Sequence, residues 1–220
     1  MDIVTRETAH TVEPESILRA RGHICAFFHG IDEEYQILLP FIKHGLESGD
    51  RALHFIDRSA HAEHVCRLTN AGIDLAAVEQ RGQFTLLHND GVYAPDGAFD
   101  AQRMIAFIQQ ALDEGHRRGF PLTRIVGHVK AETRPDDDSW IEFEAEVNQV
   151  LQRYPDPVVC IYDLSSESGA FIVDVMRTHP MIIIGGTLYE NPFYIAPDEF
   201  LRQRRERTPR NHRRGESADA

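Results

Sequence analysis

Short apolar runs alternate with amphipathic segments along most of this chain, and that alternation restricts the fold more than any other feature. The runs predicted to form strands are residues 23–28, 51–57, 83–88, 123–129, 157–163 and 180–186. The segments predicted to form helices are residues 32–47, 59–70, 101–118, 139–154 and 167–178. Strands that are apolar throughout are typical of a sheet covered on both faces. The pattern therefore predicts a three-layer α/β fold, with a mostly parallel sheet between two layers of helices.

The charge is distributed unevenly along the chain. The net charge is −12, but residues 201–220 contain seven Arg against three acids, which leaves −16 on the first 200 residues. An acidic body does not attract nucleic acid, so we expect no direct nucleic-acid binding. We predict an N-terminal arm at 1–22 with a short helix at 14–20, one domain at 23–201, and a disordered basic tail at 202–220.

Neither a membrane span nor a leader is predicted. The sequence has no apolar run of about 18 residues, and its start lacks the basic-then-apolar order of a signal peptide. We therefore expect a cytoplasmic protein that makes no membrane contact. Cys25 and Cys160 lie inside apolar runs, whereas Cys66 does not, which favours reduced, buried thiols for the first two.

Polar residues gather where the predicted strands end. Ligands of parallel α/β sheets bind at the carboxyl ends of the strands, which here gives residues 29–34, 57–59, 88–90, 128–132 and 163–166. A histidine at such an end can change charge near neutral pH, or can bond a backbone carbonyl. The candidate ligand-binding residues are His23, His29, Asp32, Glu33, Asp57, His128, Glu132, Glu144 and Tyr162.

Other polar patterns leave alternatives open. Glu144 and Asn148 are spaced i, i+4, so they either bond each other or face the pocket. His61 and His64 are spaced i, i+3, which suits two metal ligands, but two solvated helix histidines are the favoured interpretation. We predict no catalytic residues, no metal and no cofactor.

The junction "FHGIDEEY" places three acids where a nucleotide-binding protein carries a glycine-rich phosphate loop. Acids in the first turn of a helix oppose its positive end and contribute about 0.3–1 kcal/mol each. Asp32 is the expected N-cap. The acids alternatively select a cationic or neutral ligand, and nucleotide hydrolysis is not expected.

Two longer segments, "LLPFIKHGLESGDRALHFID" and "HVCRLTNAGIDLAAVEQRGQFTLLH", resemble the KaiC-like, RecA-type ATPases. Four further segments resemble the MEDS (methanogen/methylotroph, DcmR sensory) domains, which lack the phosphate loop: "HICAFFHGIDEEYQILLPFIKHGLESGDRALHFID", "RIVGHVKAE", "WIEFEAEVNQVL" and "RTHPMIIIGGTLYENPFYIAP". The resemblance extends from about residue 23 to residue 201.

The resemblance implies a RecA/KaiC-like fold with a degenerate phosphate loop and a non-enzymatic sensory function. Some relatives also carry a helix-turn-helix segment, which we do not expect here. The output would therefore pass to a regulatory protein or a second copy of the chain and act on gene expression. The family name suggests one-carbon or halocarbon signals. The alternatives are a metal-dependent hydrolase that uses His, Asp and Glu of this edge of the sheet, and a purely structural interaction module.

Overall fold

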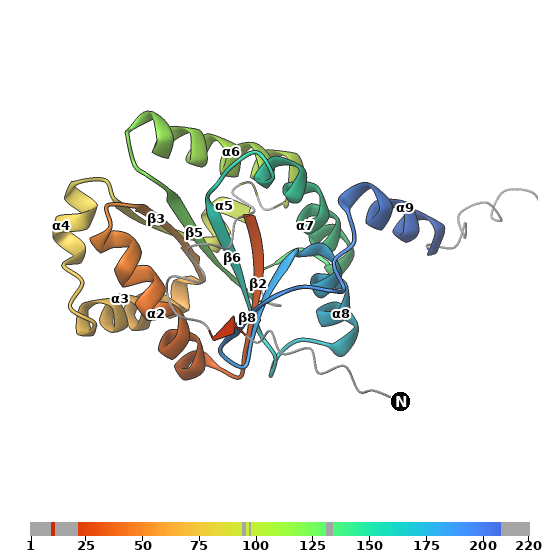
Figure 1. Ribbon diagram of the computed structural model, residues 1–220, viewed down its shortest axis with the longest axis horizontal. Coiled ribbons are helices and arrows are strands. Elements are labelled where there is room, and N and C mark those ends of the chain that lie inside the picture. Colours follow the sequence, from red (N-terminus) through yellow and green to blue (C-terminus); the bar gives the residue numbers. More distant parts are fainter. Residues whose placement is uncertain (1–9, 12–21, 94–95, 97, 131–133, 208–220) are drawn as a thin grey trace, which may run out of the picture.

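The protein is built around one eight-stranded sheet in the order β1-β8-β7-β2-β6-β5-β3-β4 (Figure 1). The structure, a computed structural model, describes residues 10–11, 22–93, 96, 98–130 and 134–207. The strands are β1 (His10–Thr11), β2 (Gly22–Phe28), β3 (Arg51–Ile56), β4 (Phe84–His88), β5 (Thr123–Val129), β6 (Pro157–Asp163), β7 (Met181–Ile184) and β8 (Thr187–Glu190). Strands β2 to β7 pair in parallel, whereas β8 is antiparallel to both β7 and β1.

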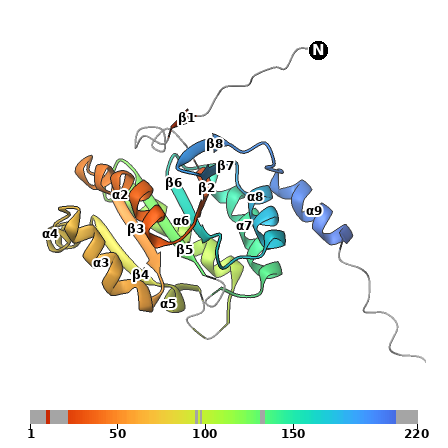
Figure 2. The ribbon, with the colours of Figure 1, turned by 90° about the horizontal axis from the view of Figure 1, so that it is seen from below.

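Helices cover both faces of this sheet (Figure 2). One layer consists of α2 (Ile31–Glu47), α3 (His61–Asn70) and α4 (Leu75–Gln80), and the other of α6 (Ala101–Arg117), α7 (Asp137–Leu151) and α8 (Gly169–Thr178). The remaining elements are the short turn η1 (Arg58–Ala60), α5 (Asn89–Tyr93) and α9 (Pro197–Arg207). The predicted three-layer α/β fold is confirmed.

Burial on two faces explains why the strands are apolar throughout. Successive side chains of a strand point to opposite faces. In β2, Ile24, Ala26 and Phe28 belong to the core beneath α2, whereas Cys25 and Phe27 belong to the core beneath α7. Cys25 and Cys160 are buried, as predicted, whereas Cys66 is exposed.

Four details differ from the sequence-based predictions. The run 180–186 is not one strand, because Gly185 and Gly186 have φ of 56° and 72° and turn the chain into the β7–β8 hairpin. Two short helices, α4 and α5, lie outside the predicted helices. Helix α9 ends at Arg207, so the predicted tail boundary at 202 falls inside it.

Part of the predicted N-terminal arm belongs to the sheet. His10 and Thr11 pair with Leu188 and Thr187 at the edge of the sheet. The predicted helix at 14–20 and the tail beyond Arg207 lie outside the described residues. Among the helices that the structure describes, none combines the length and apolar character needed to cross a bilayer.

Candidate functional site

A cavity of about 150 Å³ lies at the carboxyl ends of β2, β5 and β6, beneath the start of α2. We call it the rim cavity. Its polar lining consists of Glu34, Tyr35, His128, Lys130, Tyr162 and Asp163, and its apolar lining includes Phe28, Ile31, Ile56, Val129 and Ile161. The cavity therefore lies at the edge of the sheet that the topology predicts.

Gly30 shapes the entrance to this site. It is the N-cap of α2 with φ of 93° and ψ of 174°, and no side chain caps the helix. Because this backbone conformation is accessible mainly to glycine, the turn between β2 and α2 depends on that residue. The helix begins one residue later, at Ile31, so the prediction that Asp32 is the N-cap is wrong.

The three acids after this turn have three different partners. The Asp32 side chain is 89% exposed and pairs with Arg67 at 2.6 Å. An oxygen of Glu33 accepts the backbone N–H of His29 at 2.7 Å. Glu34 bonds His128. Successive helical residues point about 100° apart, so only Glu34 faces the cavity and the predicted site residues Asp32 and Glu33 do not line it.

Glu34 and His128 form the most polar part of the rim cavity. The Nε2 atom of His128 lies 2.6 Å from Oε1 of Glu34, and its Nδ1 lies 3.1 Å from the carbonyl oxygen of Phe55. Both acceptors require an N–H, which is the pattern of an imidazolium. Burial opposes the charge on His128, but the charge and hydrogen bond of Glu34 outweigh it and raise the pKa of His128.

A chain of neutral groups lies directly behind this ion pair. The Tyr35 hydroxyl bonds Nδ1 of His64, whose Nε2 lies 2.9 Å from Nδ1 of His54. Burial and the charge of His128 lower the pKa of His64 to about 3, and burial likewise lowers the pKa of His54. One charged histidine therefore lies beside two neutral ones.

The prediction that His61 and His64 are both solvated is wrong for His64. Its side chain faces the sheet and is buried, whereas His61 is exposed and its Nδ1 lies 3.1 Å from Nε2 of His88. The two histidines consequently point to different neighbours and do not form a metal pair.

Two further predicted residues lie near the cavity without lining it. His29 is exposed. Asp57 caps η1 by accepting the backbone N–H of Ser59 at 2.8 Å and its hydroxyl at 2.5 Å. Glu132 lies outside the described residues.

His23 and Glu144 are not at this edge of the sheet. His23 is the second residue of β2 and pairs with Val158 near the start of β6, so it lies toward the amino ends of the strands. Its rim placement was predicted wrongly, because the histidine precedes the apolar run instead of following it. Its Nε2 lies 3.1 Å from Oε2 of Glu144 and 3.2 Å from Sγ of Cys160.

Tyr162 contacts both regions. It lines the rim cavity, and its hydroxyl donates to Oε1 of Glu144 while accepting the indole N–H of Trp140 at 3.2 Å. Burial and the charge of Glu144 raise the pKa of Tyr162, so the hydroxyl keeps the proton that it donates.

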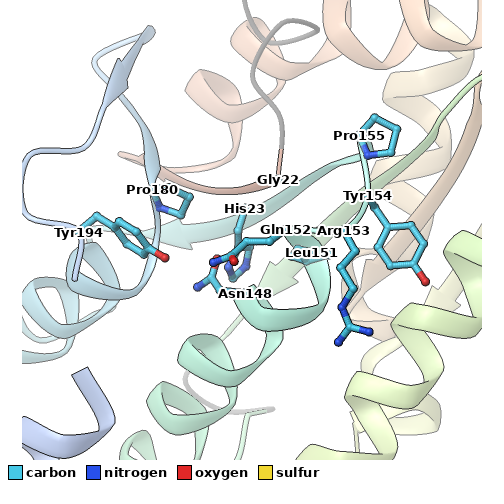
Figure 3. A pocket seen from close by; sticks show the side chains of 10 residues that line it. All are labelled: Gly22, His23, Asn148, Leu151, Gln152, Arg153, Tyr154, Pro155, Pro180 and Tyr194. Atoms are coloured by element: carbon cyan, nitrogen blue, oxygen red, sulfur yellow. The ribbon is translucent and has the colours of Figure 1, made fainter. Parts of the chain in front are cut away.

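A second cavity, of about 500 Å³, opens at the amino ends of β2 and β6 (Figure 3). Asn148 lines it and donates to the carbonyl oxygens of Glu144, at 3.0 Å, and Thr178. The Glu144–Asn148 pair is therefore joined through the backbone of Glu144, and only Asn148 faces this cavity.

Four residues at or behind the rim cavity were not among the predicted ligand-binding residues: Glu34, Tyr35, His54 and His64. Strand alternation carried a usable signal for His54, because it has the same parity as Ala52 and Ile56 and so points beneath α2. Tyr35 lies on the apolar face of its helix. The direction of Glu34 depends on where the helix begins.

Comparison with known proteins agrees with this architecture. A KaiC-like protein from Pyrococcus horikoshii superimposes with a TM-score of 0.54 at 14% identity, covering 73% of this chain and 70% of that one. This likeness identifies the fold. No curated protein matches the chain.

The family assignment comes from the sequence. The model of the methanogen/methylotroph, DcmR sensory domain family matches residues 22–180, which include β2 to α8, the rim cavity and all residues lining the second cavity except Tyr194. The matched region contains the acidic junction, the rim histidine His128 and the buried Glu144. This chain belongs to the MEDS family of sensory domains.

Proposed function

We propose that this chain is a non-catalytic sensor that binds a small molecule in the rim cavity and passes the signal to a protein partner. The observation that carries the proposal is the ion pair between Glu34 and His128, enclosed at the carboxyl ends of the strands. A ligand that bonds either group competes with that pair, so its binding changes a contact between α2 and β5.

The size and lining of the cavity limit the ligand. A volume of about 150 Å³ corresponds to about five water molecules, which suits a compound of a few non-hydrogen atoms. Apolar walls formed by Ile31, Ile56 and Ile161 accommodate a short alkyl or halogenated group. The imidazolium of His128, the carboxylate of Glu34 and the Tyr35 hydroxyl offer hydrogen bonds to one polar group. We infer a neutral or cationic ligand with one apolar end.

Selection against phosphate also supports this ligand class. A phosphate loop surrounds its anion with backbone N–H groups at the start of a helix. Here the carboxylate of Glu33 accepts the N–H of His29 at that position, and Glu34 adds a second negative charge. We interpret the junction as a degenerate phosphate loop in which the protein's own carboxylate replaces the anion.

The output is proposed to reach gene expression through another protein or a second copy of the chain. The net charge of −12 disfavours direct DNA binding. The groups in the rim cavity bond one another, Glu34 to His128 and Tyr35 to His64, which favours binding over catalysis.

A ligand screen on the purified chain tests the proposal. Thermal unfolding is measured with a panel of one-carbon and short-chain alcohols, amines, amides and halocarbons, with ATP as the phosphate control. A compound at 100 times its Kd stabilises the protein by about 2.7 kcal/mol. Glu34→Gln is expected to abolish the response, whereas the matched variant Asp32→Asn is expected to keep it, because Asp32 faces Arg67.

Two results would overturn the proposal. One is tight ATP binding or turnover, since the rim would then still accept phosphate. The other is a stabilising compound whose effect is equal in Glu34→Gln and Asp32→Asn and whose NMR shift perturbations avoid residues 30–35 and 128–130.

A further inference from the structure

Four side chains with metal-binding atoms meet in the core, away from the rim cavity. They are His23 of β2, Glu144 of α7, Cys160 of β6 and His179, which directly follows α8. One ligand atom from each lies within 4.8 Å of all the others. His23, Glu144 and His179 are at most 1% exposed, and Cys160 is 9% exposed. Two histidines, a carboxylate and a thiol rarely gather in a core without a reason.

The hydrogen bonds of this cluster are incomplete. Among the described residues, Nε2 of His179 and Nδ1 of His23 are buried with no hydrogen-bond partner, and Oε2 of Glu144 has its contact with Nε2 of His23 at 3.1 Å. An unsatisfied buried polar atom costs about 1–3 kcal/mol. The unpartnered Nε2 of His179, which is directed at the other three ligand atoms, indicates that a further atom bonds it.

The surroundings of His179 identify what is missing. Its Nδ1 lies 2.9 Å from the carbonyl oxygen of Val175, which only accepts, so Nδ1 carries the proton. In that tautomer the lone pair of Nε2 faces Oε2 of Glu144 at 3.6 Å. Two electron-rich atoms then point at each other, which a cation between them would stabilise. A backbone carbonyl on the far nitrogen is also the usual support of a metal-bound histidine.

The donor set and its spacing fit zinc. Zn²⁺ accepts imidazole, thiolate and carboxylate ligands in tetrahedral geometry. Zn–N and Zn–O bonds of about 2.0–2.1 Å and Zn–S bonds of about 2.3 Å place neighbouring ligand atoms about 3.3–3.6 Å apart. The measured separations are 3.1 Å for His23–Glu144, 3.2 Å for His23–Cys160 and 3.6 Å for His179–Glu144. The remaining pairs of ligand atoms lie within 4.8 Å, so the four side chains must move closer together when the metal binds.

A hydrogen bond supports one ligand of the cluster, and a cavity gives the metal a route to it. The Tyr162 hydroxyl donates to the other oxygen of Glu144, which orients that carboxylate. His23 lines the cavity of about 500 Å³ at the amino ends of the strands. In Figure 3, Tyr194 and Tyr154 flank the group formed by His23 and Asn148. An ion entering from this cavity therefore meets His23 first.

We propose that this chain binds one Zn²⁺ through Nε2 of His23, Oε2 of Glu144, Sγ of Cys160 and Nε2 of His179. Cys160 coordinates as a thiolate, so its S–H proton passes to solvent when the metal binds. Four protein ligands close the coordination shell, which is typical of a structural site. The metal ties β2, β6, α7 and the end of α8 together, and this function is independent of ligand binding in the rim cavity.

Cobalt substitution tests the site in the unaltered chain. The purified protein is stripped with a chelator and titrated with Co²⁺, which reports thiolate ligation by a charge-transfer band and tetrahedral geometry by intense d–d bands. We expect both, saturating at about one metal per chain, and displacement by Zn²⁺. Elemental analysis of the zinc-loaded protein should give the same stoichiometry, and zinc should raise the melting temperature.

The matched variants are Cys160→Ser and Cys25→Ser. Cys25 is a fully buried thiol on the adjacent strand, and its Sγ lies 3.6 Å from the carbonyl oxygen of Met181, outside the cluster. Cys160→Ser should remove the charge-transfer band and weaken zinc binding beyond the roughly 10–100-fold cost of losing an outer-shell partner. Cys25→Ser should keep the band and the affinity.

The cobalt spectrum of the unaltered protein tests thiolate ligation even if a variant fails to fold. A cobalt complex without the thiolate band, or substoichiometric zinc that the chelator removes without lowering the melting temperature, would overturn the proposal. So would a band that is lost in Cys66→Ser, because that would place the metal at the exposed thiol.

Discussion

The imidazolium of His128 lies 2.6 Å from the carboxylate of Glu34, with both side chains close to nine-tenths buried. This contact joins the first turn of α2 to the end of β5. Removing one partner of such a largely buried ion pair destabilises the protein, because the charge of the other partner is left uncompensated. The pair is therefore the most sensitive contact of the rim cavity.

Glu34→Gln should lower the pKa of His128. The carboxylate is what raises that pKa against the effect of burial, so without it burial dominates and the imidazole becomes neutral. The check is an NMR titration of the His128 ring. Asp32→Asn and Glu33→Gln should leave the titration nearly unchanged, since those acids bond Arg67 and His29. An equal pKa shift in all three variants would mean that the total negative charge of the three acids, and not the contact with Glu34, sets the pKa of His128.

Acid should destabilise the protein through its neutral buried histidines. The pKa of His64 is lowered to about 3, and the pKa of His54 is lowered as well. Unfolded histidines bind protons near pH 6.5, so the unfolded state takes up more protons below that pH. The stability that these residues contribute is present above pH 6.5 and is lost as the pH falls toward 3, at up to about 1.4 kcal/mol per pH unit for each histidine.

Urea denaturation at several pH values measures this slope. His64→Gln should flatten it between pH 6.5 and 4, while lowering stability at neutral pH because Tyr35 loses its partner. The exposed-site variant His29→Gln serves as the control and should keep the wild-type slope. A wild-type slope in His64→Gln would show that this histidine is already charged in the folded protein.

Gly45→Ala should destabilise the packing between α2 and β5. A Cβ at residue 45 would lie 2.5 Å from Nε of Arg124, whose guanidinium bonds Asp50 at 2.7–2.8 Å and stacks on Phe41. Displacing this buried cation should cost about 1–3 kcal/mol. Gly169→Ala, at the start of α8 with open space around it, should be neutral or stabilising by up to about 1 kcal/mol. Chemical denaturation compares the two; equal stabilities would contradict the clash.

Arg134→Lys should destabilise the protein more than the same exchange at an exposed position. The Arg134 guanidinium bonds Glu167, which is 1% exposed, and Asp137, and lies over the ring of Phe171. An ammonium cannot keep all three contacts, so we expect a loss of about 2–4 kcal/mol. Arg202→Lys changes an exposed pair with Glu199 and Glu206 and should have a much smaller effect, because solvent screens exposed ion pairs. Similar losses in both melting curves would refute the buried network.

Much of the fold is predictable from periodicity. The runs at 123–129 and 157–163 coincide with β5 and β6, because a strand covered on both faces is apolar along most of its length. The β7–β8 hairpin was not predicted, because Gly185 and Gly186 were included at the end of the predicted strand 180–186. In the structure both glycines have positive φ and form the turn of the hairpin. Short α4 and α5 carry too few residues to show a helical period.

The candidate site was predictable in position but not in detail. Topology placed His128 at the edge of the sheet where the rim cavity lies. The sequence "DEEY" does not determine which acid faces the cavity, because successive residues point about 100° apart around the helix and the direction of each depends on where the helix begins. His64 was predicted to be solvated from its polar helix, yet Tyr35 and His54 enclose it. Packing between elements far apart in the sequence decided both outcomes.

The hydrogen-bonded chain Tyr35–His64–His54 restricts which ring nitrogen of each histidine carries the proton. Each neutral imidazole has a single N–H, so the chain donates either outward, toward the tyrosine, or inward. Inward donation would leave an N–H on Nε2 of His54, a buried atom with no partner among the described residues, and an unsatisfied donor costs about 1–3 kcal/mol. Outward donation instead leaves a lone pair on that atom with no partner in the described part of the chain, and it leaves the hydroxyl proton of Tyr35 free to turn into the rim cavity. The tautomer of His54, which does not line the cavity, is therefore coupled to the polarity of the cavity wall. With outward donation, that wall favours a molecule with a lone pair to offer.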